Sequence, residues 1–342
     1  MTVPRGEIWD EFRQEALDSI PEGVVKDLSS ALTFYEWREK GGYIVTGTTG
    51  QNFHVSCATK EYGGMVAREV NELLDQALEH RLLIADTFRQ GKTPSQSWLL
   101  VTTYYWCLFL ALAWLRLVGK IITYLPTKEI DNLKELGPSN HKKTKTPKSP
   151  GSGTYTVTVN GTTGARSLLI YHRLKSNNFH DGLWQAFYAD IDQRLLSVAD
   201  TSLNSEYHLF STLSHRNKFD KTAWLSRLRN AVNYRIGFAY GSVDGRNRPQ
   251  MLDTLLAIKS ASFHDLVKEL EIAQSSTADR PVFERPDHYS RVMILFGSVL
   301  THMLEEYSAE IWKIRAIDPS RAKKRNIYAN HFNETSNTLW PF

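Results

Sequence analysis

Apolar residues recur at helical spacing along most of this chain, so the sequence predicts a mainly α fold. An amphipathic helix is expected over residues 7–19, before Pro21, and a longer one over residues 65–88, before Gly91. Helical spacing returns at about residue 181 and continues over residues 183–198, 222–240, 251–273 and 287–317. Together these segments predict a helical bundle.

One further predicted helix is apolar on every side. Residues 98–115 contain no charged side chain, and this run of 18 residues reaches the lower limit for a membrane span. It also contains four hydroxyl side chains over residues 102–105, and neither flank is strongly basic. A helix that other helices surround is apolar around its whole circumference. We therefore expect residues 98–115 to form a buried core helix that pairs with the helix over residues 65–88.

Two short stretches alternate apolar and polar residues around turn-forming residues. The first covers residues 43–57, with its turn at Gly47 to Gly50, and the second joins residues 154–159 to 167–174 through Asn160 and Gly161. They predict two β-hairpins. We therefore expect a mixed α/β region over residues 1–64, followed by a helical domain over residues 65–342 that contains an insertion over residues 137–180.

The first part of that insertion is basic. Residues 137–153 are rich in Pro and Gly and low in apolar residues, which is typical of a surface loop. Lys142, Lys143 and Lys145 lie within it. The simplest interpretation is a solvated loop, and the alternative is a basic arm that contacts RNA phosphates at low salt.

Composition narrows the class of protein only slightly. The chain has 342 residues, 42% hydrophobic content, nine Trp and a net charge of +4, which suits a large globular core but does not demonstrate nucleic-acid binding. Cys57 and Cys107 lie at no metal-ligand spacing, and the first residues contain no apolar run. We expect a reduced, cytoplasmic chain with no membrane segment, no metal and no other cofactor.

A pair of acidic residues invites comparison with paired catalytic carboxylates. Asp190 and Asp192 lie on a predicted helix together with Arg194. Acidic and basic side chains mixed on one helix are more typical of a solvated face, so we expect these three residues to face water.

The helix predicted over residues 222–240 places an arginine among apolar residues. Its stripe consists of Leu225, Leu228, Val232, Ile236 and Ala239, and at 100° per residue Arg229 falls inside the stripe, with Asn233 one turn further along. A buried guanidinium is costly unless an anion meets it. That anion is either a carboxylate of the protein, such as Glu72 or Asp75, or a phosphate from outside.

The helical pattern resembles that of the HEPN superfamily, helical domains found in toxins and prokaryotic antiviral systems. Three segments show the resemblance: the long helix over residues 65–88, the helix over residues 98–119, and the later helix over residues 229–234. The resemblance covers about half of the chain, from residue 65 to residue 240 without the loop and hairpin. It implies a homodimer that cleaves RNA without metal, in which an arginine is followed four to six residues later by a histidine.

In this chain Arg229 and Asn230 match the start of that motif, but Tyr234 stands where the histidine is expected. The resemblance makes Arg229, Asn230 and Tyr234 the candidate catalytic residues, with Arg227, Asn233 and the three loop lysines as candidate RNA ligands. Arginine binds a phosphate and its developing charge, whereas a tyrosine with a pKa near 10 is a poor general base at neutral pH.

A histidine from elsewhere is an alternative. His215 precedes the helix, and Arg325 is followed six residues later by His331, so we keep these as minor candidates. The pairs Arg166 with His172 and Arg173 with His180 have similar spacing, but both fall in or next to the predicted hairpin, where strand geometry does not reproduce a helical site.

Two hypotheses follow. The first is a HEPN-like subunit of a prokaryotic antiviral-defence or toxin–antitoxin assembly that binds RNA or a protein partner and lacks catalysis. The second is a metal-independent endoribonuclease that acts as a dimer. The chain lacks the motif histidine, the residue that cleavage needs most, so the sequence favours the first hypothesis.

Overall fold

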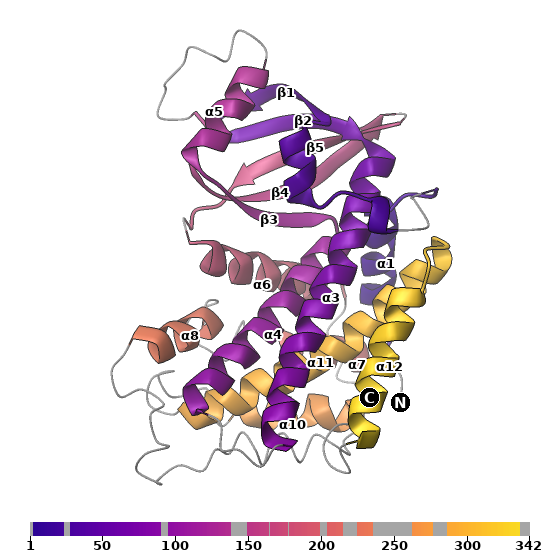
Figure 1. Ribbon diagram of the computed structural model, residues 1–342, viewed down its shortest axis with the longest axis vertical. Coiled ribbons are helices and arrows are strands. Elements are labelled where there is room, and N and C mark those ends of the chain that lie inside the picture. Colours follow the sequence, from indigo (N-terminus) through magenta and orange to yellow (C-terminus); the bar gives the residue numbers. More distant parts are fainter. Residues whose placement is uncertain are drawn as a thin grey trace.

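Two long antiparallel helices, α3 (Thr59–Arg89) and α4 (Gln96–Leu117), form the centre of the molecule (Figure 1). α3 begins six residues before the predicted start, and its later turns follow the predicted apolar spacing. The fold is mostly helical, as predicted, and an antiparallel sheet lies at one end of it. The computed structural model describes residues 3–23, 28–89, 95–137, 149–163, 165–176, 178–198, 204–214, 224–234, 262–275 and 286–335.

α4 is the buried core helix that the sequence predicted. It packs against α3, α6 (Phe179–Ser197), α8 (Trp224–Tyr234) and α11 (Pro286–Ile314). By length and composition α4 could span a membrane, but 83% of its apolar window is buried inside the protein. Packing on all sides explains why α4 has no polar face. α10 (Phe263–Ser275) packs against α11.

Five strands in the described part of the chain form one sheet in the order β1-β2-β5-β4-β3, and every described pairing is antiparallel. Residues on one face of the central strands are buried, including Phe53, Val55, Leu169 and Tyr171. The short helix α2 (Phe34–Lys40) supplies Phe34 to this apolar layer, 6.3 Å from the ring of Tyr171. The strands are β1 (Tyr43–Thr49), β2 (Asn52–Ala58), β3 (Lys120–Leu125), β4 (Gly153–Thr163) and β5 (Arg166–Arg173).

The sheet corrects the predicted positions of two turns. Thr49 pairs with Asn52, so the first turn is at Gly50 and residue 51, and Gly47 lies at a register shift within β1. In the same way Gly161 follows a register shift within β4 instead of forming the second turn. Glycine suits both an irregular strand and a turn, which explains both errors.

The sheet also contains strands from both predicted regions. β2 from the first hairpin pairs with β5 from the second, so the two hairpins share one sheet. The predicted boundary between residues 64 and 65 falls inside α3. Between α4 and the basic loop, β3 adds an edge strand and α5 (Thr127–Leu136) follows it; the sequence did not predict either element. The loop lysines lie outside the described residues.

α1 (Glu7–Ser19) has the predicted bounds, but its N-terminus is capped from far along the chain. Gly6 occupies the cap position and has no side chain to offer. The carboxylate of Glu206, on α7 (Ser205–Leu213), accepts hydrogen bonds from the backbone N–H groups of Ile8 at 3.1 Å and Trp9 at 2.7 Å. A carboxylate at this end also complements the helix dipole.

Asp190 and Arg194 do not face water, so the prediction of a solvated face is wrong for both. Their side chains are each 2% exposed and lie 2.9 Å apart from Oδ2 to Nε. Lys120 Nζ reaches the other Asp190 oxygen at 2.5 Å, and Glu15 contacts Arg194 at 2.5 Å. Asp190 and Arg194 belong to α6, Glu15 belongs to α1 and Lys120 belongs to β3. This ion network therefore connects α6 to α1 and to the sheet.

Candidate functional site

Arg229 lies on α8, a short helix at the side of α4 (Figure 1). Leu225, Leu228 and Val232 are buried, as their spacing predicted. α8 ends at Tyr234, and the predicted continuation of the apolar stripe to Ile236 and Ala239 lies outside the described residues. The buried stripe sets the rotation of α8 and turns Arg229 toward α4.

Two side-chain hydrogen bonds fix α8 against α6. Trp224 Nε1 donates to the Tyr188 hydroxyl at 3.0 Å, and Ser226 Oγ donates to Asp181 Oδ1 at 2.6 Å. Buried polar groups that are fully paired specify one relative position of two elements. The position of Arg229 is therefore set by α6 as well as by α4.

The half-buried guanidinium of Arg229 contacts phenols and an amide instead of a carboxylate. Nη2 donates to the Tyr105 hydroxyl at 3.1 Å and Nη1 to Asn230 Oδ1 at 2.8 Å. The guanidinium carbon lies 5.9 Å from the ring centroids of both Tyr104 and Tyr105. Nε is buried and has no hydrogen-bond partner among the residues that the structure describes. Among the described residues, no carboxylate lies within ion-pair distance of Arg229.

The carboxylates that could have neutralised Arg229 have other partners. Asp75 binds Arg321 at 2.5 Å and Arg325 at 2.8 Å. Glu72 binds Arg68 at 2.8 Å. The alternative in which Arg229 is sealed against one of these two acids is therefore wrong, since both contact arginines of α3 or α12 (Ser320–Thr335).

A histidine does lie beside Arg229, but it comes from α6. His180 Nδ1 is 2.8 Å from the Tyr104 hydroxyl, and the ring of Tyr104 is one of the two that flank the guanidinium. Burial, together with the positive charge of Arg229, lowers the pKa of His180 below its usual range. Both effects favour the neutral form of the imidazole.

His180 lies on a helix, so the strand geometry that the sequence led us to expect around it is wrong. α6 begins at Phe179, and the side chain of Asn178 caps it by accepting from the backbone N–H of His180 at 3.0 Å. The sequence contains an N-cap signal here in Asn178. It contains no local signal that α6 and α8 bring His180 and Arg229 together, because 49 positions separate them.

The other predicted site residues do not hydrogen-bond to Arg229 in the described part of the structure. Tyr234 is 77% exposed at the end of α8, close enough to Arg229 to affect it electrostatically, and Asn233 is also exposed. Arg227 is half-buried. His215 lies outside the described residues, as do Lys142, Lys143 and Lys145.

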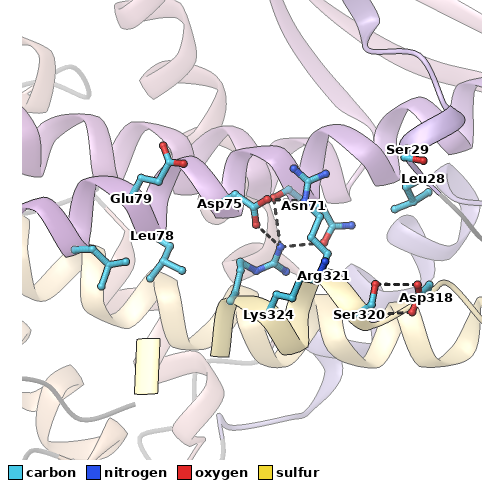
Figure 2. A pocket seen from close by; sticks show the side chains of 12 residues that line it. Leu28, Ser29, Asn71, Asp75, Leu78, Glu79, Asp318, Ser320, Arg321 and Lys324 are labelled. Carbon is cyan, nitrogen blue, oxygen red and sulfur yellow. Dashed lines mark hydrogen bonds and ion pairs between the residues drawn. The ribbon is translucent and has the colours of Figure 1, made fainter. Parts of the chain in front are cut away.

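Arg325 lies in a different part of the molecule, beside a cavity of about 550 Å³ between α3 and α12 (Figure 2). Its guanidinium is buried and donates to Asp75 and to the Asn71 side chain at 3.1 Å. Figure 1 shows α12 and α8 on opposite sides of the central helix pair. Arg325 therefore holds α12 onto α3 and does not belong to the Arg229 site. His331 is on α12, and its side chain is outside the described residues.

No family model, curated protein or solved structure matches this chain. Within the described ranges, no three His, Cys, Asp or Glu side chains come together as a metal-binding group. The Arg229 site offers hydrogen-bond donors, a positive charge and aromatic rings, which is the chemistry that binds a phosphate attached to a base.

Proposed function

We propose that this chain is a HEPN-like, RNA-binding subunit of a prokaryotic antiviral-defence or toxin–antitoxin assembly, and that it holds an RNA phosphate at Arg229. The observation that supports this most is the guanidinium itself, which is half-buried with no carboxylate partner among the described residues. Keeping an unneutralised charge near apolar surface costs stability, and an anionic ligand would offset that cost.

Aromatic neighbours support RNA over a simple inorganic anion. Tyr105 stacks with His80 at 5.8 Å between ring centroids, and His80 stacks with Phe109 at 5.3 Å. All three rings are partly exposed. Single-stranded nucleic acids bind where positive charge adjoins aromatic rings, because bases stack on the rings while phosphates meet the charge.

The second candidate function is metal-independent RNA cleavage by a homodimer. His180 is the observation in its favour, because it places an imidazole next to Arg229 although α8 has no histidine after that arginine. Cleavage needs a general base, and neither neighbour of Arg229 is well suited to that role. Tyr234 is an exposed phenol, and the Nδ1 atom of His180 already contacts Tyr104. RNA binding is therefore the better proposal.

Replacing Arg229 with Met tests the proposed function. The variant keeps most of the side-chain length and removes the charge, and Lys268→Met removes one charge from an exposed position on α10 as a control. We expect Arg229→Met to weaken binding of a fluorescently labelled single-stranded RNA at least about tenfold, since a charged hydrogen-bonding group contributes about 1.5–3 kcal/mol. The free energy of unfolding should stay within about 2 kcal/mol of the parent value.

Two results would contradict the proposal. Equal RNA affinity in Arg229→Met and Lys268→Met would remove Arg229 from any RNA site. A stability loss of about 3–5 kcal/mol in Arg229→Met would instead identify a structural ion pair with a stranded partner. Adding a chelator to the parent protein with RNA checks the second candidate, because metal-free cleavage would continue.

A further inference from the structure

A chain of hydrogen bonds fixes the protonation of His180. Trp184 Nε1 lies 3.3 Å from the Tyr104 hydroxyl, which lies 2.8 Å from His180 Nδ1. An indole N–H only donates, so the hydroxyl oxygen accepts from Trp184. Tyr104 is fully buried, and its single hydroxyl proton therefore needs an acceptor. Nδ1 of His180 is that acceptor, which leaves the imidazole proton on Nε2.

Protonating His180 would break this chain. A charged imidazole has a proton on both nitrogens, so Nδ1 could no longer accept from the buried Tyr104 hydroxyl, and that proton would be stranded. Arg229 of α8 also repels a positive charge at this position, and Asp181 favours one. Asp181 already accepts a short hydrogen bond from Ser226 at 2.6 Å, so its charge is partly satisfied.

We propose that His180 is a second phosphate ligand, whose Nε2–H donates to the RNA phosphate held by Arg229, and that Trp184 and Tyr104 lock it in this donor form. The proposal rests on the RNA-binding function proposed for Arg229. The guanidinium and the imidazole flank the same phenol, which places both groups beside one site. Because Nδ1 is already engaged, His180 has no free lone pair with which to take a proton from an RNA 2′-hydroxyl. In this form His180 holds the phosphate and does not act as a general base.

The tautomer can be measured without RNA. In ¹⁵N-histidine-labelled full-length protein, the resonances missing from His180→Phe identify His180. We expect an unprotonated Nδ1 and a protonated Nε2 at pH 7.5. In Tyr104→Phe, which removes the hydroxyl, the pKa of His180 should rise. A parent His180 that is charged at pH 7, or that carries its proton on Nδ1, would overturn the proposal.

RNA affinity tests the ligand role. His180→Phe keeps a ring but removes the donor, and we expect about tenfold weaker binding of the labelled single-stranded RNA. His180→Gln restores an N–H donor and should recover most of that loss. His264→Phe replaces an exposed histidine on α10 and should bind like the parent. Tyr104→Phe should bind RNA more tightly at pH 5.5 than at pH 7.5, with a larger change than the parent shows.

The outcomes separate this proposal from the proposed function. If Arg229→Met loses RNA binding while His180→Phe keeps it, the RNA site stands and His180 is not a ligand. If Arg229→Met keeps RNA binding, the function proposed for Arg229 fails, whatever the tautomer of His180. If the parent cleaves RNA in the presence of chelator and His180→Phe does not, His180 takes part in cleavage and the donor-only assignment is overturned.

Discussion

Replacing Asp190 with Asn tests how much the buried ion network stabilises this fold. The carboxylate accepts from Trp114 Nε1 at 2.8 Å, Lys120 Nζ at 2.5 Å and Arg194 Nε at 2.9 Å. Asn keeps the shape of Asp and removes its charge. Arg194 would then be a cation with a 2% exposed side chain, whose remaining anionic partner, Glu15, is 36% exposed.

The expected loss is about 3 kcal/mol. Removing one partner of a buried pair costs about 3–5 kcal/mol, and the lower end applies because Glu15 stays in place and Lys120, 27% exposed, can reach water. An unfolding entropy of about 2.1 cal/mol/K per residue converts this loss to a fall of about 4 °C in Tm. Burial alone would raise the pKa of Asp190, but Arg194 and Lys120 outweigh it and hold the pKa below its usual range. The stabilisation is therefore complete above the usual carboxyl pKa and is lost only as the pH falls through the lower folded value.

Urea unfolding followed by tryptophan fluorescence measures this difference at pH 7. Asp131→Asn makes the same chemical change at an exposed position on α5 and should have almost no effect. Adding Arg194→Met to Asp190→Asn removes both charges, so the double variant should lose less than the sum of the two single variants. A loss below about 1 kcal/mol for Asp190→Asn, or additive losses in the double variant, would refute the argument that this pair is energetically coupled.

Two further substitutions probe the helical core. Leu108→Ala on α4 should cost about 2–5 kcal/mol in urea unfolding, because Leu108 is buried and truncation leaves a cavity; an unchanged midpoint would contradict the burial. Burial, with a smaller effect of Arg81, lowers the pKa of His302 to about 4. The unfolded chain, with a His pKa near 6.5, therefore binds this proton first, and stability should fall by about 1.4 kcal/mol per pH unit from pH 6.5 toward pH 4. Between pH 7 and pH 5, the free energy of unfolding should fall by about 2 kcal/mol less in His302→Gln than in the parent. An equal fall in both proteins would count against the lowered pKa of His302.

Local patterns predicted the helices well and the long-range contacts poorly. α1 and α4 follow directly from apolar spacing and from the uncharged run, because both patterns record which side of a helix is buried. The alternation of residues also located both hairpins. Nothing in either hairpin shows that β2 will pair with β5, because that pairing depends on the path of more than 100 intervening residues.

For the candidate site too, the sequence predicted local features and missed contacts between distant residues. The apolar stripe around Arg229 predicted that this charge would lie against the protein body. The spacing of Asp190 and Arg194 is the same for a buried pair and a solvated one, so the sequence could not distinguish them. His180 approaches Arg229 only because α6 and α8 both pack on α4, and its role could not be inferred from its neighbours in sequence.

The cap on α1 has a consequence for how the chain folds as it is synthesised. Glu206, which accepts hydrogen bonds from the N–H groups of Ile8 and Trp9, is made about 200 residues after α1. At about 5–20 residues per second, α1 waits roughly 10–40 s for its cap. Until then the first N–H groups of α1 lack the carboxylate that caps them in the folded protein. The docking of α7 therefore acts as a late closing step that joins the first part of the chain to its middle.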